Sequence, residues 1–188
     1  RVSEQKDSEI FGLIIATLSW ANRKSIIKSG KNLLKIMDNE PYKFVINFNE
    51  NEFNLLNDFK HRTFNAFDLQ FFILRLQKIY KRFGSLEELF APDFKKNKNS
   101  FEAIVNFRQE FLGEHHEIRS KKHVANPIKG SAAKRINMFL RWMVRKDNKG
   151  VDFGIWNKIS PSKLSCPLDI HSGRSARELN LLKREQND

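Results

Sequence analysis

Apolar residues recur every three or four positions along most of the chain, the spacing that places them on one face of a helix. Asp7 or Ser8 can cap the first such segment, which ends near Trp20. The apolar positions of this first helix are Ile10, Leu13, Ile14 and Leu18. Alternation of apolar and polar residues, which is typical of strands, is scarce. The pattern therefore predicts an all-α protein.

A second helix is expected after Asn22, whose side chain can cap it. Gly30 lies inside this helix and would allow a neighbouring element to approach closely. The apolar positions of this helix are Ile26, Ile27, Leu33, Leu34 and Met37.

Further helix boundaries follow from proline, glycine and capping residues. Pro41 suits the first turn of a short helix, and an amphipathic segment over 68–83 ends at Gly84. Ser85 and Glu88 have the spacing of a capping box. The segment 92–100, rich in lysine and asparagine, is expected to be an exposed loop.

A helix is also expected from Ser100, its cap, to Gly113, its stop. Up to this point the pattern indicates only a helical domain.

Charge changes the picture. The net charge is +12, of which residues 1–113 carry +4 and the shorter segment 114–188 carries +8. Clustered lysine and arginine side chains bind phosphates and release counterions. The basic C-terminal segment indicates a nucleic-acid partner, with a solvated basic surface as the alternative.

Other composition features narrow the class. Cys166 is the single cysteine, so no disulfide or four-cysteine metal cluster forms within the chain. No apolar run approaches the roughly 18 residues that a membrane span needs. We expect a cytoplasmic protein without cofactor or metal; the neighbouring His115 and His116 are weak metal candidates.

A tight turn follows the basic segment 118–125. The string Asn-Pro-Ile-Lys-Gly-Ser at 126–131 leads into a helix expected over 132–145. Gly130 allows the backbone to approach a ligand, and a helix start presents unpaired N–H groups to an anion. Lys129, Lys134 and Arg135 add positive charge there. The turn predicts phosphate-backbone binding, with an ordinary helical hairpin as the alternative.

Two motifs carry a family resemblance. Residues 130–134, Gly-Ser-Ala-Ala-Lys, resemble the hairpin and catalytic lysine of helix-hairpin-helix (HhH-GPD) DNA glycosylases. Residues 167–177, beginning Pro-Leu-Asp-Ile-His, resemble the motif that supplies the family's catalytic aspartate. The strings around both motifs are similar to an uncharacterised bacterial branch near this superfamily. That resemblance covers nearly the whole chain and implies that segments of the family are missing at both ends.

The resemblance implies a two-lobed helical fold with a cleft. Its lobes would be residues 1–113 and the basic segment 114–188. It implies a base-excision glycosylase acting as a monomer on lesion-containing double-stranded DNA, with Lys134 and Asp169 catalytic. Abasic-site lyase activity would proceed through a Schiff base on Lys134. Asp169 would support the developing positive charge on the sugar while capping the next helix.

Other site residues follow from these motifs. The expected DNA contacts are Lys122, Lys129, Gly130, Ser131, Arg135, His171 and Arg174. A base pocket or wedge would use Trp142, Phe153 or Trp156, and for Trp142 a place in the core is the alternative.

Departures from the family pattern motivate a second hypothesis. Ala132 replaces the second hairpin glycine, and Ile128 and Lys129 replace the usual Leu-Pro. A non-catalytic DNA- or RNA-binding module is therefore the second hypothesis. A helical protein-interaction scaffold is a third, independent of these departures.

Overall fold

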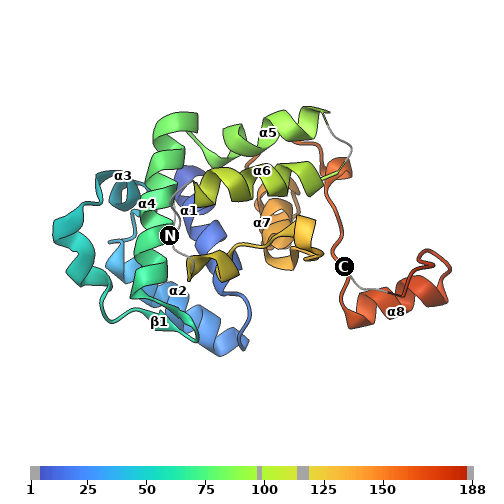
Figure 1. Ribbon diagram of the computed structural model, residues 1–188, viewed down its shortest axis with the longest axis horizontal. Coiled ribbons are helices and arrows are strands. Elements are labelled where there is room, and N and C mark those ends of the chain that lie inside the picture. Colours follow the sequence, from blue (N-terminus) through green and yellow to red (C-terminus); the bar gives the residue numbers. More distant parts are fainter. Residues whose placement is uncertain (1–4, 97–98, 114–118, 186–188) are drawn as a thin grey trace.

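The computed structural model describes residues 5–96, 99–113 and 119–185, and it is mostly helical (Figure 1). Its α-helices are α1 (Gln5–Leu18), α2 (Arg23–Ile36), α3 (Pro41–Asn47), α4 (Ala66–Phe83), α5 (Leu86–Lys96), α6 (Phe101–Leu112), α7 (Lys134–Val144) and α8 (Ile170–Glu178). Short 3-10 helices are η1 (Glu50–Leu56), η2 (Ser120–His123), η3 (Pro127–Lys129) and η4 (Pro161–Lys163), and one antiparallel hairpin pairs β1 (Lys60–His61) with β2 (Phe64–Asn65). Within the described ranges no helix has the length and hydropathy that a membrane crossing needs.

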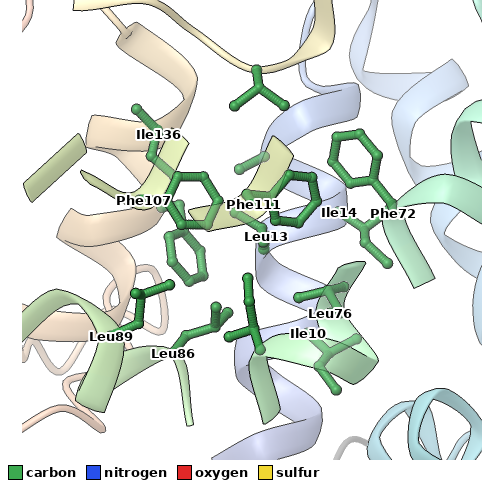
Figure 2. Packing of buried hydrophobic residues seen from close by; sticks show 14 of the residues in the cluster. Ile10, Leu13, Ile14, Phe72, Leu76, Leu86, Leu89, Phe107, Phe111 and Ile136 are labelled. Atoms are coloured by element: carbon green, nitrogen blue, oxygen red, sulfur yellow. The ribbon is translucent and has the colours of Figure 1, made fainter. Parts of the chain in front are cut away.

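Helix α1 lies at the centre of the fold. Nine of its 14 residues are buried, which suits a helix that is covered on most of its circumference. Figure 2 shows Ile10, Leu13 and Ile14 of α1 among side chains from the surrounding helices. The surrounding side chains labelled there are Phe72 and Leu76 of α4, Leu86 and Leu89 of α5, Phe107 and Phe111 of α6, and Ile136 of α7.

Contact between α1 and α7 joins the two segments that were expected to form separate lobes. A Cβ atom added at Gly12 of α1 would meet Met143 Cε of α7 at 3.0 Å, so only glycine permits this approach without a shift. One cluster of buried hydrophobic residues includes side chains from both 1–113 and 114–188. The two segments therefore share a core.

Two predicted helix ends and one predicted close approach between helices are confirmed. The Asn22 side chain accepts from Ser25 N at 2.9 Å and caps α2. Gly84 ends α4 in the left-handed conformation with a φ of 81°. Gly30 lets α1 approach α2, because an added Cβ would lie 3.1 Å from Ile15 Cδ1.

The prediction of a loop over 92–100 is wrong for residues 92–96. Helix α5 continues to Lys96 with Pro92 inside it. Proline has no N–H and so breaks the hydrogen-bond ladder of a helix, a defect that costs about 3 kcal/mol. Phe90 and Phe94 are buried on either side of Pro92 and hold the helix against the core. Tertiary packing thus overrides the local signal.

Helix α8 projects away from the bundle (Figure 1). Gly173 is its only buried residue, and Ile170 is 75% exposed. Its start agrees with the sequence expectation, because Asp169 caps it.

The carboxyl group of Glu9 links α1 to three other parts of the chain. Glu9 is completely buried. It accepts hydrogen bonds from Tyr80 Oη at 2.7 Å, Trp156 Nε1 at 2.8 Å and Leu86 N at 3.0 Å. Burial, together with the neighbouring Glu9, raises the pKa of Tyr80 well above its usual value, which keeps the phenol protonated as a donor.

We expect Glu9→Ala to lower the free energy of unfolding by at least about 3 kcal/mol, because three buried donors lose their acceptor. Urea unfolding followed by circular dichroism measures this. Glu102→Ala removes an exposed carboxylate from the first turn of α6 and should cost less than about 1 kcal/mol. Equal losses in the two variants would contradict the central role of Glu9.

Candidate nucleic-acid interface

The turn before α7 is closed by backbone hydrogen bonds. Gly130 N donates to Pro127 O at 2.9 Å, and Ser131 N donates to Asn126 O at 3.2 Å. Gly130 has a φ of 77°, in the left-handed region that favours glycine. No atom lies within 4 Å of a Cβ added there, so the backbone at this turn faces open space.

Helix α7 begins without a side-chain cap. Its N-cap residue is Ala133, which adopts a left-handed φ of 48° and has no side-chain acceptor. Helices α2, α4 and α8 are instead capped by Asn22, Asn65 and Asp169. The first N–H groups of a helix attract anions, and here no cap side chain accepts from them.

A groove of about 680 Å³ lies beside this helix start. It is lined by residues of α6, η2, the turn and the first turn of α7. Its basic lining residues are Arg108, Lys121, Lys122, Lys129, Lys134 and Arg135. Among the described residues that line it, none is acidic. We call this the basic groove.

Two arginines of the basic groove are fixed by backbone carbonyls. Arg108 Nη1 donates to Val124 O and, at 3.4 Å, to Lys121 O. Arg135 Nη1 donates to Thr17 O of α1 at 2.7 Å. Burial lowers the pKa of both guanidinium groups. These arginines hold the groove wall to the core while leaving their charge beside it.

Lysines supply the movable charge of the basic groove. Lys122, Lys129 and Lys134 are exposed, and none has a hydrogen bond or ion pair with another described residue. Their ammonium groups can therefore turn towards an anion without first breaking a contact.

A buried carboxyl group supports the groove from behind. Asp68 of α4 is fully buried and accepts from Ser120 Oγ at 2.9 Å and Arg119 Nη2 at 3.2 Å. His123 Nε2 lies 3.3 Å from Asp68 Oδ2 without the alignment of a hydrogen bond. These contacts hold η2, which carries Lys122, against the start of α4.

The two predicted catalytic residues lie in different settings. Lys134 is the first residue of α7 and lines the basic groove. Asp169 is exposed immediately before α8, and neither Asp169 nor any residue of α8 lines that groove. The Asp169 carboxylate accepts from Ser172 N at 2.7 Å, and this hydrogen bond lowers the pKa of Asp169. The structure thus gives Asp169 the capping role that its position predicts.

The other predicted contacts divide in the same way. Lys122, Lys129, Ser131 and Arg135 all line the basic groove, and Gly130 lies in the adjoining turn. The α8 residues His171 and Arg174 are exposed outside it, and Arg174 pairs with Glu178 at 2.9 Å.

The predicted base-stacking aromatics lie in the last turn of α7, which contains Trp142, and in the segment that follows it. Phe153 N donates to Trp142 O at 2.7 Å, and Phe153 is 51% exposed. Trp142 is half-buried and packs against the core. Trp156 is 2% exposed and packs on Phe90 and Phe139, so its predicted place as a wedge is corrected to a place in the core.

Arg108 and Lys121 also line the basic groove, although the sequence predicts no individual role for either residue. Arg108 lies in α6, 26 positions before Lys134, and only packing brings the two together. A basic residue on an amphipathic helix carries no sequence signal for such a role.

Metal ligation has no support in the described part of the chain. No group of three or more histidine, cysteine, aspartate or glutamate side chains there could hold an ion. His115 and His116 lie outside the described residues.

One protein family matches the chain. The family described as "Protein of unknown function (DUF2400)" matches residues 1–188. The chain belongs to this family. No curated protein matches it, and no solved structure does.

Acidification should weaken the support behind the basic groove. Burial lowers the pKa of His123 from its ordinary value of 6.5, aided by Lys122 and Arg135 and opposed by Asp68. His123 therefore binds a proton more readily in the unfolded chain than in the folded protein. Its contribution to the free energy of unfolding is fully present above pH 6.5 and is lost as the pH falls from 6.5 through the lowered pKa. We expect the stability advantage of wild type over His123→Gln to shrink across this window in urea unfolding. An advantage independent of pH would contradict this.

Proposed function

We propose that this protein binds the phosphate backbone of double-stranded DNA through the basic groove. The observation that carries the proposal is the convergence of six basic side chains, without a lining carboxylate among the described residues, at the uncapped start of α7.

The chemistry of the groove suits phosphates better than base edges. Lysine ammonium groups and helix N–H groups bind phosphate oxygens without reading sequence. Arg108 and Arg135 already donate to backbone carbonyls, which limits the forked contacts that arginine makes with guanine. Binding is therefore sequence-independent and weakens steeply with salt.

The triple variant Lys122→Gln, Lys129→Gln, Lys134→Gln tests the groove by fluorescence anisotropy on duplex DNA over a salt series. Each phosphate contact contributes about 0.9 to the slope of log K against log salt, so loss of three contacts lowers the slope by about 2.7.

A charge-matched control variant is Lys95→Gln, Lys96→Gln, Lys149→Gln, which removes three exposed lysines outside the groove. It should retain nearly the wild-type slope. Equal slopes in the groove variant and in its control would contradict the assignment of the basic groove as the binding site.

A second candidate is base excision with lyase activity, in the helix-hairpin-helix glycosylase arrangement that the motifs imply. The observation favouring it is the position of Lys134 within the basic groove. The amine of Lys134 would attack C1′ of an abasic sugar and expel water to form a Schiff base, and β-elimination would then release the 3′ phosphate. It stays a prediction that this protein is a cytoplasmic monomer and that it acts on lesion-containing duplexes.

Borohydride reduction tests this chemistry, because it converts a Schiff base into a stable protein–DNA adduct. Wild type and Lys129→Gln should form the adduct on an abasic duplex, whereas Lys134→Gln should lose it almost completely. An adduct of equal yield in Lys134→Gln, or none in wild type, excludes Lys134 as the nucleophile. DNA binding itself would remain measurable in either case.

A further inference from the structure

Helix α2 carries a second set of lysines that the basic groove does not include. These are Lys24, Lys28, Lys31 and Lys35, all exposed. A helix turns about 100° per residue, so their spacing places all four within about 60° of one another. They cover about 17 Å along the axis. We call this set the α2 lysine stripe.

The helix that carries the α2 lysine stripe is packed against the core and capped at its start. Leu33 and Met37 are buried, and Gly30 allows α1 to pack closely. Asn22 caps the start of α2. The lysines therefore form a fixed row on the face of α2 that points away from the core.

The charge of the stripe is not neutralised within the described structure. Helix α2 contains no acidic residue. None of its four stripe lysines has an ion pair with another described residue, whereas Lys43 pairs with Glu40 and Lys158 with Glu88 elsewhere. Four like charges in one row repel one another, and an anion that lies across several of them relieves this repulsion.

Adjoining elements connect the stripe to the basic groove. Ser29 Oγ of α2 lies 2.8 Å from His61 Nδ1 of β1. At the other side of the hairpin, Arg119 Nη2 donates to Thr63 O at 2.9 Å, immediately before η2. The hairpin itself exposes Lys60 and Arg62. Basic side chains thus follow a continuous path of contacting elements from α2 to the groove wall.

We propose that the α2 lysine stripe is a second phosphate-contacting surface that extends the duplex DNA footprint beyond the basic groove. This inference rests on the proposed function. A row of about 17 Å faces several phosphates of a duplex, which carries one charge per about 1.7 Å of axis. An anionic membrane fits less well, because most of the apolar side of α2 is buried and Ile27, which is 47% exposed, is the one exposed large hydrophobic residue of this helix.

The experiment is the salt dependence of binding to a long duplex by the full chain. The stripe variant is Lys24→Gln, Lys28→Gln, Lys31→Gln, Lys35→Gln, and its charge-matched control is Lys95→Gln, Lys96→Gln, Lys149→Gln, Lys183→Gln. The stripe variant should lower the slope of log K against log salt by about 2 to 4, and the control by much less. Changing the same four stripe lysines to arginine keeps their charge and should therefore give the wild-type slope. This variant separates an effect of charge from an effect of misfolding.

The outcomes separate this inference from the proposed function. If the stripe variant has the same slope of log K against log salt as its control, the inference is overturned. The proposed function still stands in that case, provided that the slope of the groove variant is lower than that of wild type. Absence of salt-sensitive binding in wild type overturns both. Loss of sedimentation with phosphatidylserine vesicles in the stripe variant, with an unchanged DNA slope, assigns the stripe to a membrane and also overturns the inference.

Discussion

The buried carboxyl group of Glu9 is the contact on which the arrangement of the helices depends. It accepts from Tyr80 of α4, from Leu86 N at the start of α5 and from Trp156 beyond α7. A buried polar group without partners costs several kcal/mol, so all three donors must stay in register with α1. Hydrophobic burial supplies the drive to pack these helices, and this one acceptor decides how they meet.

The basic groove inherits its shape from that core. Arg135 ties the start of α7 to Thr17 of α1, and Gly12 brings the two helices close enough for this bond. Arg108 binds the carbonyls that lead into the turn, while Asp68 fixes η2 behind it. Arginines thus build a rigid frame and lysines provide adaptable charge, which suits a ligand whose charges repeat along its length.

Binding and base excision make different demands on this chain. The proposed phosphate contacts need only the basic groove and the α2 lysine stripe, both of which lie on packed helices. Glycosylase chemistry also needs a carboxylate beside the sugar, and Asp169 caps α8, which projects from the bundle. Duplex binding is therefore the proposal that the geometry supports best, and the proposed catalysis would depend on where α8 lies in a complex with DNA.

The sequence by itself determined the helical class and many boundaries, because caps such as Asn22 and Asp169 and stops such as Gly84 act within a few residues. It also located the basic turn. Tertiary structure alone decided that α5 runs through Pro92 and that Trp156 lies in the core. Joining Arg108 to the groove required packing too, since contacts between distant segments depend on the energy of the whole core and leave no local signal.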